Sequence, residues 1–118
     1  MSYVDGYVLP VPQDKLAAYR RLARMAAKVW KEHGALEYVE SVADDVKPGK
    51  HTSFQQAVKL KPGEVVVFAY VVFKSRAHRD KVNKAVMSDP RLAGMDAKNM
   101  PFDGKRMIWG GFKPLVTM

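Results

Sequence analysis

The side chains of this sequence that could do chemistry begin with a carboxylate near its start. Asp5 lies in an apolar stretch that should form a strand, and a buried acid must be paired, hydrogen-bonded or raised in pKa. One interpretation makes Asp5 a general base or a ligand anchor, with Tyr7 on the same face of the strand because it is two residues away. The alternative is a structural ion pair with Lys105 or Arg106 on a neighbouring last strand.

A histidine in the second half of the chain is the other candidate for acid or base chemistry. His78 shares a helical face with Val82 and Ala85, so it should point towards a sheet. It could line a pocket between helix and sheet and exchange protons there, although the commoner role of such a histidine is that of a satisfied core residue. Asp5 and His78 are therefore the catalytic candidates.

Two aromatic residues complete the candidate site. Trp109 precedes Gly110 and Gly111, and a pair of glycines in a strand indicates a bulge or a place where another backbone or a ligand approaches closely. With the first and last strands as neighbours, Tyr7 and Trp109 would lie together. We predict these two as ligand-binding residues of a pocket between the helices and the sheet.

Metal and cofactor chemistry find little support in the sequence. Asp44, Asp45 and His51 are potential ligands of a hard cation, but their spacing matches no metal motif and a solvated loop is the simpler interpretation. The chain has no cysteine, which excludes disulfides, thiolate metal sites and cysteine nucleophiles. We expect no metal and no cofactor.

Length and charge limit the remaining possibilities. The 118 residues suit one domain spanning residues 1–118, and the net charge of +8 suggests either a solvated basic surface or an anionic partner such as nucleic acid. The first residues lack the basic and apolar pattern of a secretory signal, and no apolar run is long enough to cross a membrane as a helix. We expect a cytoplasmic protein without a membrane partner.

The elements that must position these residues are organised around one apolar stretch. Residues 65–73 are nine successive apolar residues rich in β-branched and aromatic types, which indicates a central strand covered on both faces. Hydrophobic periodicity, capping residues and breakers then predict the other elements: strands over 3–11, 35–43 and 105–115, helices over 15–33 and 74–89, a short helical turn after Ser53 within the polar stretch 44–63, and another turn near Leu92.

This order predicts an α+β fold of the ferredoxin-like βαββαβ kind. Its four-stranded antiparallel sheet would carry both helices on one face. The other face would expose a large apolar area, so we expect a second copy to cover it in a homodimer. The pattern leaves open whether the even-numbered or the odd-numbered residues of 65–72 face that partner, because both sets are apolar.

Four segments resemble a known family. They are YVDG at residues 3–6, ADDVKPGK at residues 43–50, KSRAHRD at residues 74–80 and MPFDGKRM at residues 100–107. In this order they resemble the bacterial domain of unknown function 1428 family, which is similar to the dimeric α+β barrel superfamily. That superfamily includes cofactor-free monooxygenases, isomerases and haem-handling enzymes, so the resemblance implies a fold and no single activity.

Two functions are therefore expected as alternatives. The first is a homodimeric α+β barrel that holds an unknown small organic molecule between sheet and helices, and that could be a cofactor-independent enzyme. The second is a basic RNA- or DNA-associated module that uses the outer faces of the helices. Its surface would combine Arg20, Arg21, Arg24, Lys28 and Lys31 with Arg76, Arg79 and Lys84.

Overall fold

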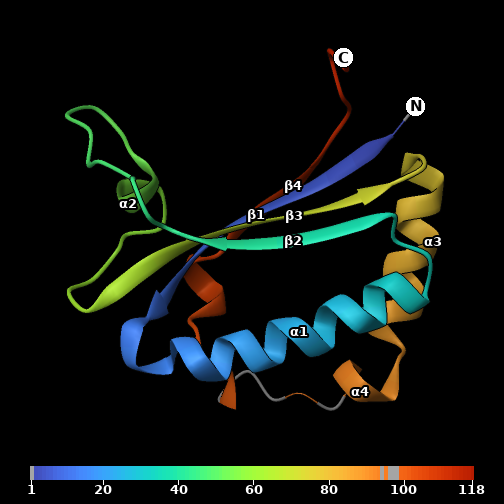
Figure 1. The fold of residues 1–118 in the computed structure, drawn as a ribbon, viewed down its shortest axis with the longest axis horizontal. Helices are drawn as coiled ribbons and strands as arrows, with labels where there is room; N and C mark the ends of the chain where they lie inside the picture. Colours follow the sequence, from blue (N-terminus) through green and yellow to red (C-terminus); the bar gives the residue numbers. More distant parts are fainter. Residues whose placement is uncertain (1, 94, 96–98) are drawn as a thin grey trace.

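The computed structural model describes residues 2–93, 95 and 99–118, which form a mixed α+β fold (Figure 1). No helix among these residues is long and apolar enough to cross a bilayer. The strands are β1 (Tyr3–Pro12), β2 (Glu37–Val42), β3 (Glu64–Phe73) and β4 (Ile108–Phe112), and the helices are α1 (Leu16–Glu32), α2 (Phe54–Ala57), α3 (Arg76–Met87) and α4 (Pro90–Ala93).

The described strands form one antiparallel sheet in the order β2-β3-β1-β4. The long strands β1 and β3 are central and pair along their whole length, from Tyr3 opposite Phe73 to Pro12 opposite Glu64. Figure 1 shows α1, α3 and α4 on one side of the sheet and the short α2 on the other side, near one end. The sheet therefore has one face mostly covered by helices and one face mostly without them.

Strand β3 separates its residues between these two faces. Val67, Ala69 and Val71 are buried on the helix side, whereas Phe68 points to the opposite face and is 45% exposed. Because antiparallel partners share a face, the same alternation carries across β1 and β4. The even-numbered residues of the stretch 65–73 therefore point away from α1 and α3.

The core on the helix side is divided into two clusters. One contains Tyr3, Val29, Phe73, Val82 and Val86 among its buried residues, and the other contains Leu9, Val11, Tyr19 and Val67. Tyr7 packs against both clusters from β1. The two clusters leave room between them, and the candidate site lies there.

Several element ends differ from the sequence-based expectation. The helix expected from residue 15 begins at Leu16, because a 3-10 turn over Gln13–Lys15 precedes it, and no side chain caps it. The last strand begins at Ile108 instead of residue 105, since the Asp103 carboxylate accepts the backbone N–H of Lys105 and holds residues 104–106 in a second 3-10 turn. The expected helical turns after Ser53 and at Leu92 are confirmed, and the structure adds that the Ser75 side chain caps α3.

A charged cluster joins the ends of three helices. Asp89 follows α3 and is 8% exposed, and its carboxylate binds the Arg91 guanidinium through Nε at 2.9 Å and Nη2 at 2.8 Å. His33 Nε2, just after α1, lies 2.9 Å from the same carboxylate, and Arg91 also contacts Glu32 at 2.6 Å. Hydrogen bonds from Arg91 and His33 hold the pKa of Asp89 well below its ordinary value.

This cluster gives stability a defined dependence on pH. The ionised Asp89 is favoured in the folded chain, so its contribution is fully present above the ordinary carboxyl pKa of about 4 and is lost as the pH falls below it. We expect Asp89→Asn to lower the urea midpoint at neutral pH, and we expect the gap from wild type to narrow in acid. Urea unfolding of both proteins at several pH values measures this, and a gap that widened in acid would contradict it.

Candidate functional site

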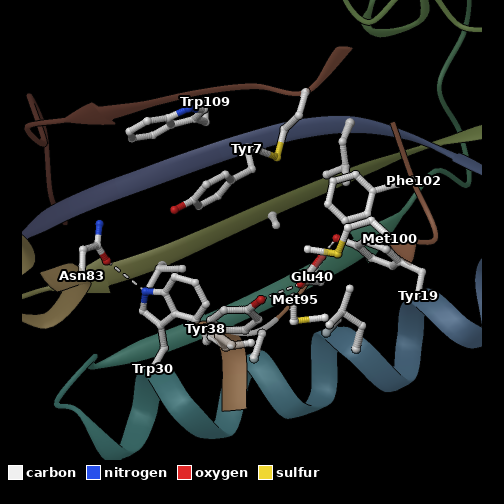
Figure 2. A pocket seen from close by; sticks show the side chains of 18 of the residues that line it. Tyr7, Tyr19, Trp30, Tyr38, Glu40, Asn83, Met95, Met100, Phe102 and Trp109 are labelled. Carbon is white, nitrogen blue, oxygen red and sulfur yellow. Dashed lines mark hydrogen bonds between the residues drawn. The ribbon is translucent and has the colours of Figure 1, made fainter. Parts of the chain in front are cut away.

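A cavity of about 440 Å³ lies between the helix-covered face of the sheet and α1, α3 and α4. Its described lining is mostly apolar. Six aromatic residues, four methionines and seven aliphatic residues contribute to it, and Glu40 and Asn83 are its polar members. Figure 2 shows side chains converging on it from β1, β2, β4, α1 and the segment before β4. A mostly apolar hollow with few polar groups is typical of small-molecule sites.

The aromatic residues of the lining are arranged in three pairs. Tyr7 and Trp109 stack with their ring centroids 6.1 Å apart, as adjacent residues of β1 and β4. Tyr19 of α1 meets Phe102 edge-on at 5.6 Å, and the rings of Trp30 and Tyr38 lie 5.8 Å apart. These rings give the cavity rigid walls, because an aromatic side chain has few rotamers to lose.

One carboxylate reaches the cavity from the edge strand β2. Glu40 shares the helix-side face with Tyr38 because the two are two residues apart, and it lies opposite Ala69 of β3. Its Oε2 accepts a hydrogen bond from the Tyr38 hydroxyl at 2.6 Å, and its Oε1 accepts one from the Tyr19 hydroxyl of α1. Two tyrosines from different elements therefore hold this carboxylate in one orientation.

The tyrosine hydroxyls around the cavity are hydrogen-bond donors at neutral pH. Burial, followed by the nearby Glu40 carboxylate, raises the pKa of Tyr19 and of Tyr38 far above the ordinary value. Burial, followed by the charge of Asp5, raises the pKa of Tyr7 to about 12. All three hydroxyls therefore stay protonated near neutrality and can donate hydrogen bonds.

Asp5 lies behind the lining and is fully buried. Arg79 of α3 pairs with it, with Nε 3.2 Å from Oδ1, and Asn83 Nδ2 donates to Oδ2 at 3.1 Å. Asn83 in turn accepts a hydrogen bond from Trp30 Nε1 at 3.0 Å (Figure 2). Burial raises the pKa of Asp5, and the bond from Asn83 and the charge of Arg79 oppose that rise. An ion pair was the right kind of contact, but the expected partners Lys105 and Arg106 are wrong.

Arg106 and Arg79 both have places that differ from their expected ones. Arg106 binds Glu64 of β3 through two nitrogens, at 2.7 and 2.6 Å, and does not pair with Asp5. Arg79, expected on the outer basic surface, turns inward to Asp5 and covers the Tyr3 ring at 5.0 Å. The other residues expected on that surface are exposed as predicted, namely Arg20, Arg21, Arg24, Lys28, Lys31, Arg76 and Lys84.

The structure brings only some of the predicted site residues together. Tyr7 and Trp109 both line the cavity, and Trp109 is 59% exposed, which places it at the rim. Asp5 reaches the lining only through Asn83. Their roles in binding or catalysis stay predictions, because their positions alone do not test them.

His78 lies outside the cavity lining. The Nδ1 atom of its ring accepts a hydrogen bond from the backbone N–H of Lys74 at 3.0 Å. The backbone N–H of His78 donates to the hydroxyl of Ser75, the N-cap residue, at 3.1 Å. The imidazole also packs edge-on against Phe73, with centroids 6.1 Å apart. This arrangement gives His78 a structural role at the start of α3. The role is similar to that of the N3 residue of a capping box, the third residue after the N-cap.

The lining residues that were not predicted from the sequence include Tyr19, Tyr38, Glu40 and Asn83. The sequence did contain a sign that Glu40 faces the core, because Glu40 shares one face of its strand with Tyr38 and Val42. A charge on an otherwise apolar face needs a partner or a ligand. Tyr19 similarly stands on the apolar face of α1.

Metal binding has no structural support in the described part of the chain. No three His, Cys, Asp or Glu side chains among those residues lie close enough to hold an ion together. Asp44, Asp45 and His51 are exposed loop residues.

Gly111 makes the network around Asp5 possible. It pairs with Asp5 on the helix-side face, and a methyl group there would overlap the Arg79 guanidinium and the Tyr3 hydroxyl. A close approach does occur at Gly111, but side chains of β1 and α3 make it, and not the backbone or ligand that was expected there.

We expect Gly111→Ala to lower the free energy of unfolding by about 1–3 kcal/mol, because the methyl group displaces Arg79 from Asp5. Gly110→Ala is the matched control, since a methyl group there meets only the Phe112 ring, at 3.7 Å. Urea unfolding of the two variants measures the difference. Equal losses in both would show that the overlap at Gly111 does not matter.

Comparison with known proteins places the chain among close relatives. It is 50% identical over 116 residues to the uncharacterized protein YbaA of Escherichia coli (strain K12), with 98% of each chain covered, and the YbaA protein of Shigella flexneri matches equally well. The de novo designed protein Foldit4 matches 97% of this chain and 99% of its own with a TM-score of 0.49 at 11% identity. The model of a family described as a protein of unknown function, DUF1428, matches residues 2–104, so the resemblance seen in the sequence is confirmed and the chain belongs to the DUF1428 family.

Proposed function

We propose that this protein binds a small, largely apolar organic molecule in the cavity between the sheet and the helices. The observation that carries the proposal is the cavity itself, with about 440 Å³ of space and an aromatic lining. Protein interiors are normally closely packed, and a hollow of this size lies in the range that drug-sized ligands occupy. The basic surface of α1, the alternative site for nucleic acid, shares none of its residues with the cavity lining.

The rigid parts of the site support recognition by shape. Tyr38 and Glu40 come from β2, Tyr7 from β1 and Trp109 from β4, so most of one wall stands on the sheet. Sites built on strands and helices hold their geometry better than sites on loops. The polar groups Glu40 and Asn83 would orient a ligand whose remaining surface contacts rings and aliphatic chains.

Filling the cavity should abolish binding without harming the fold. We expect Ala23→Phe, on the cavity side of α1, to weaken binding of the uncharged fluorescent probe N-phenyl-1-naphthylamine about tenfold or more. The same change should raise the free energy of unfolding by about 1 kcal/mol, as cavity filling commonly does. Fluorescence titration and urea unfolding measure the two effects.

Ala17→Phe is the control for this experiment, because Ala17 is exposed on the same helix and lies outside the lining. It should leave probe binding unchanged. Equal binding of the probe by wild type and both variants would mean that the probe binds elsewhere, and would refute the proposal.

We further propose that the strand order β2-β3-β1-β4 is the ferredoxin-like arrangement and that two copies pair as a dimeric α+β barrel. Support comes from the face of the sheet turned away from α1. Phe68, Ile108 and Phe112 stand there with 45%, 46% and 63% of their surface exposed. Val4, Val8 and Val72 lie on the same face by register. These residues form a contiguous apolar patch, unlike the isolated apolar residues that are common on protein surfaces. A second copy placed sheet to sheet would bury this patch.

A charge on this face should separate the two copies. We expect Phe68→Lys and Ile108→Lys each to shift the mass in solution from dimer to monomer, because a buried unpaired charge at the interface is costly. Ala17→Lys on the exposed side of α1 is the control and should remain a dimer. Light scattering at micromolar concentration gives the masses, and a monomeric wild type would remove this part of the proposal.

A further inference from the structure

We propose that the ligand of this cavity is an organic cation, with an apolar or aromatic body and a basic nitrogen, and that Glu40 is its counter-ion. This inference rests on the proposed function, since it names the chemical class that the same cavity would take. It follows from the charge of the lining, from the way other carboxylates of the chain are paired, and from the rings around Glu40.

The charge of the described lining is opposite to that of the chain. The chain has 20 Lys and Arg residues and a net charge of +8. Among the described residues that line the cavity there is no Lys, Arg or His, and Glu40 is the acid among them. A site that recognised a carboxylate or a phosphate would be expected to present a cation or a group of N–H donors to it. This lining presents a carboxylate instead.

Other poorly exposed carboxylates of this chain have an arginine partner. The side chains of Asp5, Glu64 and Asp89 are 0%, 9% and 8% exposed, and they pair with Arg79, Arg106 and Arg91. In the described part of the chain, Glu40 has no such cation and is held by the hydroxyls of Tyr19 and Tyr38. A purely structural carboxylate between α1 and β2 would explain the tyrosines, but it would not explain why the described part of a chain with 20 Lys and Arg residues supplies no cation here.

The carboxylate has capacity for one more partner. Each oxygen of Glu40 accepts one tyrosine hydroxyl, and a carboxylate offers about four acceptor positions. The two hydroxyls fix the orientation of the carboxylate before any ligand arrives, which reduces the entropy lost on binding. A bound ammonium would thus meet an oriented, partly desolvated negative charge.

The rings beside Glu40 suit the same ligand. Tyr38 donates to Glu40 and stands next to Trp30, and Tyr19 donates to it from the other side and meets Phe102. The faces of aromatic rings attract cations, Trp most strongly, and they also contact the apolar part of an organic amine. A single carboxylate with aromatic walls is too poor in oxygen ligands for a hard metal ion.

Three probes with one ring system and different charges test the inference. They are 2-naphthylmethylammonium, 2-naphthylmethanol and 2-naphthoate, titrated by calorimetry at neutral pH into the wild-type protein. A hydrogen-bonded charge pair should make the ammonium bind about tenfold tighter than the alcohol. The carboxylate should bind most weakly, because it would face Glu40.

Three further variants test whether the preference depends on Glu40. Glu40→Gln keeps the shape and removes the charge, so the ammonium should lose its roughly tenfold advantage over the alcohol. Glu37→Gln is the matched control, because Glu37 is exposed on the opposite face of β2 and the net charge changes equally. Tyr38→Phe removes one donor but keeps the carboxylate, and it should keep the preference for the ammonium.

The possible outcomes separate this inference from the proposed function. Equal affinity for the three probes, lost in Ala23→Phe, would overturn the cation inference and leave the cavity as a binding site. A preference for the ammonium that persists in Glu40→Gln would overturn the role of Glu40. Absence of saturable binding of all three probes, or binding insensitive to Ala23→Phe, would overturn the proposed function and this inference with it.

Discussion

The pairing of a fully buried carboxylate determines how the helices sit on the sheet. Asp5 is in a central strand, and a charge in that position is tolerable only with partners close by. α3 supplies them as Arg79 and Asn83, and Asn83 also binds Trp30 of α1. One chain of contacts therefore positions both long helices over β1. The cavity wall made by Asn83 and Trp30 is a consequence of neutralising a charge that does not itself face the cavity.

The sheet could be predicted because its signals are local. The apolar run of β3 and the glycine and proline breakers around it come from adjacent residues, and they gave the strands and helices in the right order. The unbroken apolar run of β3 also implied that both faces of this strand are apolar. Choosing between these faces required the docking of α1 and α3, which no local pattern encodes, since Ala69 and Phe68 are both apolar. The structure resolved that choice through packing.

The candidate site was only partly predictable because its contacts join distant elements. Tyr7 and Trp109 were found from strand alternation and adjacent glycines, which are short-range features. The hydrogen bond from Tyr19 to Glu40 depends on how α1 lies across β2, and the ion pair of Asp5 with Arg79 depends on which turn of α3 faces the sheet. His78 had the right helical spacing for an inward position, but the first turn of a helix needs caps, and its imidazole serves there.

The cavity has a consequence for the fate of the chain in a cell. Its space of about 440 Å³ lies where a protein of this size would otherwise keep packed side chains, so the empty form lacks their dispersion contacts. Any molecule that fills the space supplies those contacts and shifts the folding equilibrium by mass action. If the proposed ligand binds here, chains without it would unfold more often and be open to proteolysis more often. The steady amount of this protein would then follow the supply of its ligand, with no separate regulator.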